Sequence, residues 1–309
     1  MGDGLYAWMQ PDGGWGWSNA GFVRDGDQAM LVDTLFDEPL TGVMLEAIER
    51  ATGVAPDGIG WLVNTHANGD HTRGNALVTR AEVIASAAAA REMAELPPAV
   101  LAQLKAGGAA GALGDAGRFF AEIFAPFDFM HARGRAPTRT FDRRLDLTIG
   151  NKPVELHVLG PAHTAGDLLV WLPGDRTVYT GDLLFIDSTP VMWAGPVGNW
   201  LAACDRILAF GARHIVPGHG PMTDSAGVQR VQQYLRYLDR EARCRFDAGI
   251  PAEAAALDIA LGEYRHWLNA ERIVVNVDTL YREYRGDTAA ADPIVLFGLM
   301  ARVRRELRG

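Results

Sequence analysis

Metal-binding side chains are concentrated in one short segment of this 309-residue chain, Thr65-His66-Ala67-Asn68-Gly69-Asp70-His71. The segment follows an apolar run over residues 59–64, which predicts a buried strand. In a tight turn, residues two positions apart can point the same way, so His66 and Asn68 could converge on one point while Asp70 and His71 converge on a neighbouring one. Imidazole and carboxylate groups are ligands of zinc and similar ions. The segment therefore predicts a metal site at the carboxyl end of a strand, where open α/β sheets place their sites.

Three more candidate ligands follow apolar runs farther along the chain. His163 lies in GPAHTAGD after residues 154–159, Asp182 in YTGDLLF after residues 177–179, and His219 in VPGHGP after residues 214–216. Singly, such residues also occur in ordinary turns. Their recurrence after successive strands predicts a site with up to two metal ions.

In their order and their places after strands, these residues resemble the ligands of the metallo-β-lactamase superfamily. The resemblance covers residues 5–224 and implies an αββα sandwich with the metals at one edge of the two sheets. On the family pattern, Asp182 would bridge two metal ions, one held by His66, the residue at position 68 and His163, the other by Asp70, His71 and His219. The resemblance also implies that Asp33, which follows the apolar run 29–32, is an acidic residue that supports the ligands.

The chain departs from the family motif at Asn68, where the family usually has a histidine. An amide oxygen is a neutral and weaker ligand for zinc than imidazole. Three arrangements stay open: two metals with a weak first position, one metal at Asp70, His71 and His219, or one metal at His66, His163 and Asp182. The last set, two histidines and a carboxylate, is typical of non-haem iron oxygenases and resembles the persulfide dioxygenases of the superfamily. We expect zinc, as one or two ions, with iron or manganese as alternatives.

Aromatic residues near these motifs predict a substrate pocket. Trp15 and Trp17 alternate with glycines in PDGGWGWSNAG, and the matching loop of the family overhangs the metals. Trp193, in the stretch that follows Asp182, could close the pocket from the other side. Tryptophans on an exposed loop suit a hydrophobic or aromatic small molecule.

The leading hypothesis is a metal-dependent hydrolase. A metal ion lowers the pKa of bound water from about 16 toward 7, and the resulting hydroxide would attack an ester, thioester or lactone. Asp70 would bind metal and orient this nucleophile, and Asn68 is a candidate donor to the oxyanion. Alternatives are a cyclase or lyase acting on a polyketide-like substrate, an iron dioxygenase, and a non-catalytic protein that binds a small ligand. GGWGWSNAGFV, GPAHTAGDLLVWLP and VPGHGP are also similar to the polyketide thioesterase and cyclase branch.

Alternating strands and helices must position these residues. Short apolar runs predict strands up to residue 216, including one over residues 139–147, with helices over residues 40–51 and 199–210. A stretch rich in Ala and Leu, residues 86–130, predicts a helical insertion. Beyond residue 225 the apolar spacing of three and four residues predicts helices alone. We expect a catalytic domain over residues 1–224 and a helical subdomain over residues 225–309.

Composition restricts the partners. The chain is 48% hydrophobic and 22% charged, as globular proteins are, and carries a net charge of −9 from 29 Lys and Arg and 38 Asp and Glu. This acidic balance argues against nucleic acid as a ligand. Two cysteines, Cys204 and Cys244, make no disulfide framework, and no apolar run is long enough to cross a membrane. We expect a cytoplasmic protein without a membrane partner, in which the C-terminal helices cover the pocket or form a homodimer.

Overall fold

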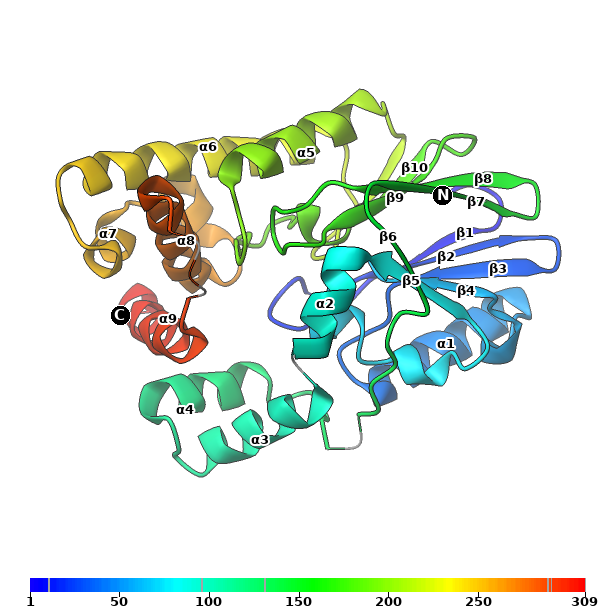
Figure 1. Cartoon of the computed structure of the whole chain (residues 1–309), viewed down its shortest axis with the longest axis horizontal. Coiled ribbons are helices and arrows are strands. Elements are labelled where there is room, and N and C mark those ends of the chain that lie inside the picture. The colour runs from blue at the N-terminus through cyan, green and yellow to red at the C-terminus, as the bar shows by residue number, and fades with distance from the viewer. Residues whose placement is uncertain (11, 96, 131, 288, 290, 309) are drawn as a thin grey trace.

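Two β-sheets stack face to face, with helices on their outer sides (Figure 1). The computed structural model describes residues 1–309 apart from residues 11, 96, 131, 288, 290 and 309, so Pro11 of the glycine-rich motif lies outside the described residues. The first sheet has the order β1 to β6, and its strands are Leu5–Trp8, Ala20–Asp25, Gln28–Val32, Trp61–Val63, Glu82–Ser86 and Arg139–Phe141. The second has the order β11-β10-β9-β8-β7, and these strands, in that order, are His214–Val216, Thr177–Tyr179, Leu168–Leu172, Lys152–Val158 and Arg144–Ile149.

The alternation of side chains along the strands builds the layers. Met30 and Val32 of β3 point into the core between the sheets, whereas Leu31 points outward to the core under α1 (Glu38–Thr52). In the second sheet, Val170 of β9 points inward and Trp171 points outward to the core under α5 (Val197–Ala209). Both sheets are therefore covered on both faces, and the predicted αββα sandwich is confirmed.

Residues 139–147 form two strands instead of the single one predicted. Arg139–Phe141 (β6) is the edge of the first sheet, paired parallel with β5, and Arg144–Ile149 (β7) is the edge of the second, paired antiparallel with β8. The chain crosses between the sheets at Asp142 and Arg143, both exposed. Polar and apolar residues alternate on both sides of this crossing, so periodicity alone did not reveal it.

Two groups of helices face each other beside the sandwich. The first, between β5 and β6, comprises α2 (Ala87–Glu95), α3 (Pro98–Ala109) and α4 (Gly114–Ile123). The second comprises α6 (Ser225–Asp247), α7 (Ala252–Asp258), α8 (Ile273–Arg285) and α9 (Pro293–Arg308). Helix α9 packs on both α4 and α8 and so joins the two groups (Figure 1). None of the described helices is long and apolar enough to span a membrane.

The C-terminal helices share a core with the second sheet. Trp200 of α5, Tyr234 and Leu238 of α6, and Val277 and Leu280 of α8 belong to one buried apolar cluster. The cluster includes the periodic residues that predicted these helices. The division at residue 224 stays a prediction.

Candidate metal centre

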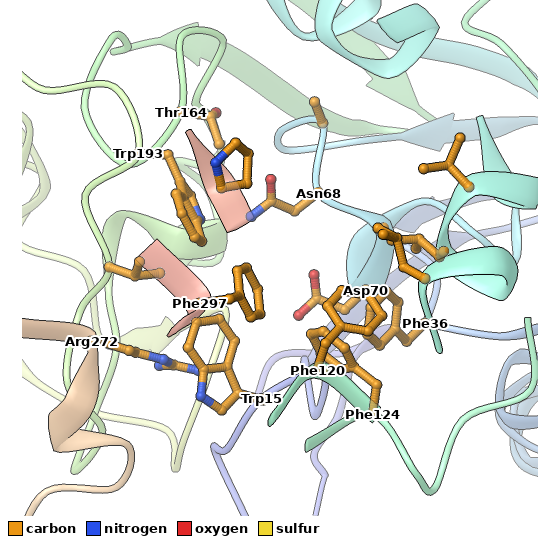
Figure 2. Close-up of a pocket in the computed structure, with 18 of the residues that line it drawn as sticks. Trp15, Phe36, Asn68, Asp70, Phe120, Phe124, Thr164, Trp193, Arg272 and Phe297 are labelled. Atoms are coloured by element: carbon orange, nitrogen blue, oxygen red, sulfur yellow. The ribbon is translucent and has the colours of Figure 1, made fainter. Parts of the chain in front are cut away.

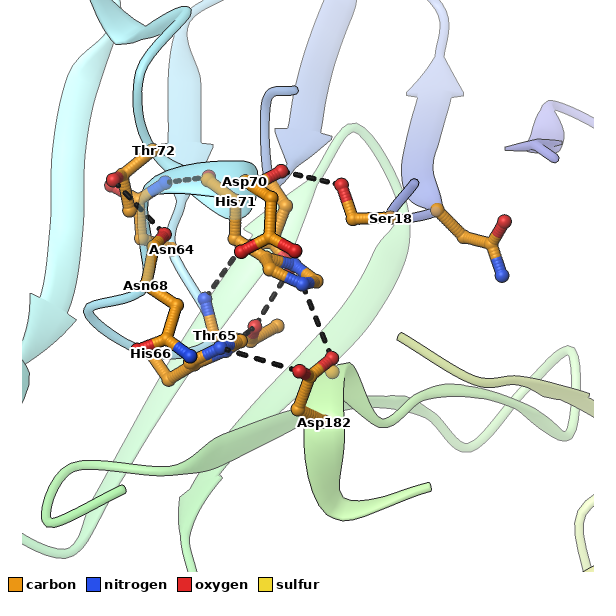
Figure 3. Close-up of polar contacts among 12 residues, drawn as sticks. Ser18, Asn64, Thr65, His66, Asn68, Asp70, His71, Thr72 and Asp182 are labelled. Carbon is orange, nitrogen blue, oxygen red and sulfur yellow. Dashed lines mark hydrogen bonds and ion pairs between the residues drawn. The ribbon is translucent and has the colours of Figure 1, made fainter. Parts of the chain in front are cut away.

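Four histidines direct Nε2 toward the carboxylate of Asp182. The nearest carboxylate oxygen lies 3.1 Å from Nε2 of His71, 3.3 Å from that of His163, 3.4 Å from that of His219 and 3.7 Å from that of His66. All five side chains are buried. Figure 3 shows His66 and His71, from the loop after β4, facing Asp182, from the loop after β10. Asp182 therefore lies at the centre of the cluster, where a bridging ligand would be needed.

Loops at the ends of strands supply these groups. His66 and His71 follow β4, His163 follows β8, Asp182 follows β10 within the short 3-10 helix Gly181–Leu183, and His219 follows β11. The loops pack closely: a Cβ at Gly218 would collide with a carboxylate oxygen of Asp182, so only glycine fits at position 218.

Hydrogen bonds to Nδ1 fix the tautomers of three of these histidines. His71 donates from Nδ1 to Asp33 (2.9 Å), and His163 donates from Nδ1 to the backbone oxygen of Val191 (2.6 Å). The hydroxyl of Thr65 donates to Asp33 and so accepts from Nδ1 of His66 at 3.0 Å. Each bond leaves Nε2 facing the cluster, where it can bind a metal ion in its deprotonated form. Asp33, which has a left-handed φ of 62°, thus accepts hydrogen bonds from both His71 and Thr65.

The charges of the cluster match a cation. Burial opposes ionisation of Asp70, but the hydrogen bond and charge of His219 and the charge of His71 outweigh it, so the pKa of Asp70 is lowered to about 2. Burial likewise opposes ionisation of Asp182, and the surrounding histidines still hold its pKa well below the ordinary value. Two buried carboxylates therefore carry negative charge at neutral pH. Burial opposes protonation of His71 and His219, but the neighbouring carboxylates outweigh it and raise the pKa of both, so these histidines carry the balancing positive charge that a metal ion would replace.

Unsatisfied atoms show where such an ion belongs. Among the described residues, Nε2 of His66, Nε2 of His71 and Oδ1 of Asp182 are buried without a hydrogen-bond partner. The ligand atoms fall into two groups, His66 with His163 and Asp182, and Asp70 with His71 and His219, each with its atoms within 4.8 Å of one another. Imidazole nitrogens and carboxylate oxygens in this arrangement fit one or two divalent metal ions.

Asn68 lies beside the first group but bonds a ligand rather than joining it. Its amide nitrogen lies 2.9 Å from Nε2 of His163. Because Nδ1 of His163 is the donor to Val191, Nε2 is the acceptor, and the amide of Asn68 donates to it. The amide therefore occupies the lone pair that His163 would offer to a metal ion.

The metal-ligand cluster opens into an apolar cavity of about 570 Å³ (Figure 2). Asn68, Asp70, His163, Asp182 and His219 contribute to its lining. So do the rings of Phe120 in α4, Phe124 directly after α4 and Phe297 in α9. Trp15 and Trp193, two of the three predicted pocket tryptophans, also line it. Trp17 lies against Phe127, with 4.8 Å between the ring centroids, and is not among the lining residues.

Several supporting residues had no separate signal in the sequence. Val191 acts through its backbone oxygen, which any residue could supply. Thr65 belongs to the histidine motif, yet only its contacts reveal its role. Arg272 lines the cavity from the start of α8. Its one signal was a charged pair, Glu271-Arg272, directly before an apolar helix.

Comparisons with known proteins agree with this geometry. A family model described as the metallo-beta-lactamase superfamily matches residues 13–219. Metallo-beta-lactamase type 2 of Bacteroides fragilis is 24% identical over 118 residues, which make up 35% of this chain and 45% of that protein. A linear primary-alkylsulfatase of a Pseudomonas species is 31% identical over 115 residues, 35% of this chain and 21% of that protein.

A solved structure extends the fold comparison to the C-terminal helices. The stereoselective inverting sec-alkylsulfatase of a Pseudomonas species superposes with a TM-score of 0.71 at 14% identity, covering 93% of this chain and 50% of that one. At this identity the likeness concerns the fold alone. The chain spans no more than half the length of each of these three relatives.

Proposed function

The chain belongs to the metallo-β-lactamase superfamily, and from this premise we propose that it is a metal-dependent hydrolase of an ester, thioester or lactone. The substrate is a hydrophobic or aromatic small molecule. One observation carries the proposal: the residues able to hold metal line the same cavity as the phenylalanines of α4 and α9. An apolar cavity with a few convergent polar groups is the usual form of a small-molecule site.

The two ligand groups would hold one or two divalent ions, for which zinc is our first expectation and iron or manganese the alternatives. A bound ion of this kind lowers the pKa of water and polarises the bond to be cleaved. Side chains at the metal centre would orient the water and stabilise the oxyanion.

Asp70 orients the attacking water. Its carboxylate lines the cavity, and its backbone oxygen accepts a hydrogen bond from Ser18, which fixes the turn that carries it (Figure 3). A carboxyl group whose pKa is about 2 is ionised at neutral pH and is a weak base. Asp70 therefore accepts a hydrogen bond from the water and aligns it, and it does not keep a proton taken from that water.

Asn68 stabilises the oxyanion. If His163 held a metal ion through Nε2, the amide N–H of Asn68 that bonds this atom would be free for another acceptor. The amide lines the cavity and can donate to the oxygen on which negative charge develops (Figure 2). A donor placed in this way stabilises the transition state more than the ground state.

Sulfate-ester hydrolysis is a second candidate. It is supported by the 31% identity over 115 residues to a protein named linear primary-alkylsulfatase. An alkyl sulfate combines an apolar tail, which the cavity suits, with an ester that water can cleave.

A substrate panel tests both candidates. Purified protein is assayed with aryl esters, acyl thioesters, lactones and medium-chain alkyl sulfates, with and without chelator, beside an Asp182→Ala variant. The proposal predicts turnover that chelator and Asp182→Ala abolish and that added metal restores only in the wild type. No turnover across the panel, or turnover indifferent to chelator, would contradict it. Iron as the sole metal, with oxygen uptake in the presence of a thiol persulfide, would replace it by the dioxygenase alternative.

A further inference from the structure

One buried arginine lines the cavity beside the metal centre. Arg272 ends the 3-10 helix Ala270–Arg272, directly before α8, and is 1% exposed. Its guanidinium carbon lies 4.2 Å from the ring centroid of Trp15 and 5.3 Å from that of Phe185. Among the described residues that line the cavity, it is the only arginine or lysine. Figure 2 shows its side chain reaching the cavity beside Trp15.

Arg272 has no carboxylate in direct contact. No carboxylate of the described residues forms an ion pair with it, and its Nε is buried without a hydrogen-bond partner. The charges of Glu271, Asp182 and Asp70 act on it only from farther away, and Glu271 accepts from the indole nitrogen of Trp15 at 2.9 Å. Burial lowers the pKa of Arg272 to about 10, so the group is still charged at neutral pH. A buried, unpaired cation is costly unless something completes it.

A structural role accounts for the hydrogen bonds of Arg272 but not for its buried charge. Nη1 donates to the hydroxyl of Ser188 (3.1 Å) and the backbone oxygen of Thr189 (2.9 Å), which anchors the loop after Asp182. Two neutral acceptors on one nitrogen leave the guanidinium without a contacting anion. The aromatic rings of Trp15 and Phe185 favour a cation but do not neutralise it.

Arg272 lies close to the metal-ligand cluster. The ring of Phe185 stacks on His219, with centroids 5.0 Å apart and planes 4° apart, and the guanidinium lies over the same Phe185 ring. One aromatic ring therefore separates Arg272 from a metal-ligand histidine. The rest of the cavity wall is dominated by apolar side chains of α3, α4 and α9. The cavity thus offers a metal centre, a nearby cation and an apolar channel.

We propose that Arg272 is a specificity-determining residue that binds an anionic group of the substrate, a carboxylate or a sulfate, while an apolar chain of the same molecule occupies the cavity. The guanidinium suits both anions because its planar fork donates two parallel hydrogen bonds. This inference rests on the proposed function in one respect: it takes the cavity as the substrate pocket. It narrows the substrate class from hydrophobic molecules to amphiphilic anions.

Binding measurements test the inference without turnover. Octanoate, octyl sulfate and 1-octanol are titrated calorimetrically into the wild type, Arg272→Gln and Arg272→Lys, with Arg285→Gln on the surface of α8 as the matched control. We expect Arg272→Gln to weaken binding of one or both anions by about 10- to 100-fold, as loss of a charge-assisted hydrogen bond does. Octanol should bind Arg272→Gln and wild type alike, Arg272→Lys should be intermediate, and Arg285→Gln should match the wild type.

The two anions separate the carboxylate from the sulfate as the preferred group, and either preference supports the role of Arg272. Equal affinity of wild type and Arg272→Gln for both anions would overturn it, because the metal centre alone would then hold the anion. Circular dichroism and thermal melting confirm that each variant is folded. If Arg272→Gln fails to fold, the comparison of Arg272→Lys with wild type decides in the same way.

Matched esters keep the inference distinct from the proposed function. 4-Nitrophenyl hydrogen adipate carries a terminal carboxylate that 4-nitrophenyl hexanoate lacks. Arg272→Gln should raise KM for the adipate ester at least about 10-fold with little change in kcat, and should leave KM for the hexanoate ester unchanged. Hydrolysis with the same KM change for both esters would refute the role of Arg272 and leave the hydrolase intact. Anion binding by Arg272 without any hydrolysis would refute the hydrolase and leave the site intact.

Discussion

At the scale of single residues, the site depends on which atom of each histidine holds the proton. Asp33, Thr65 and the backbone oxygen of Val191 each accept from an Nδ1, so the Nε2 atoms of three histidines face Asp182. The sequence could predict the ligands, because each follows an apolar strand. It could not predict Val191 as a partner, because a backbone carbonyl is common to every residue.

Asn68 has a different role in the structure from the one that the family motif implies. From the sequence it is a weak replacement for a ligand, and in the structure it donates to a ligand, His163. Both observations place it at the metal centre without making it one of the ligand atoms in the two groups.

Replacing Asn68 by alanine tests its proposed role in catalysis. We expect Asn68→Ala to lower kcat by about 100-fold with little change in KM, because an oxyanion donor acts mainly in the transition state. Metal content should stay at the wild-type value. Steady-state kinetics with the best ester of the panel, alongside elemental analysis, provide the measurement. Asn199→Ala, at an exposed position of α5, is the control. An unchanged kcat would remove Asn68 from the mechanism.

At the scale of elements, two loops hold His163 in place. The loop between β8 and β9 carries it, and Asp167 closes this loop by accepting from the backbone nitrogen and hydroxyl of Thr164. The loop after Asp182 supplies Val191 and is held by α8, since Asn276 accepts from the backbone nitrogen of Met192 at 2.7 Å. The helices beyond residue 224 thus reach the metal centre through hydrogen bonds. Periodicity predicted α8, but not this contact, because its buried Asn276 lies outside the apolar pattern.

Asp167 gives this element a predicted pH dependence. Burial, only partly offset by the bonds from Thr164, raises the pKa of Asp167 to about 8. A carboxyl group with a raised pKa in the folded state stabilises the protein most at low pH, and this contribution is lost as pH rises toward 8. In metal-free protein, the free energy of unfolding of the wild type should therefore fall more steeply with pH than that of Asp167→Asn. The difference in slope is at most about 1.4 kcal/mol per pH unit, the value for one proton.

Urea unfolding of both proteins between the ordinary carboxyl pKa and pH 8 measures this slope. Asp142→Asn, at an exposed position between β6 and β7, is the matched surface control. Equal slopes for wild type and Asp167→Asn would show that Asp167 is ionised in the folded protein.

At the scale of the whole molecule, the sandwich was predictable, but of the cavity only the part that Trp15 and Trp193 line was predicted. Continuous apolar runs such as Leu168–Leu172 specify a strand with two buried faces, and strand-end histidines specify one edge of the sheets. The cavity depends on the packing of α9 against α4, two segments far apart in the sequence. An apolar stripe such as that of α9 predicts that one face of the helix is buried, but it does not predict which other element packs against that face. For the same reason, Phe297 and Arg272 were not predicted to line one pocket.

The central claim is that the His and Asp cluster holds metal, and metal content per chain tests it most directly. Elemental analysis is applied to wild type, Asn68→His and Asp182→Ala, with Asp187→Ala, an exposed aspartate of the same loop, as control. The account predicts one or two divalent ions per wild-type chain and the same number in Asp187→Ala. It predicts tighter retention of an ion at His66 and His163 in Asn68→His, and loss of metal in Asp182→Ala, because this carboxylate lies between the two groups. Wild-type protein that takes up no metal, or Asp182→Ala that keeps the wild-type content, would contradict it.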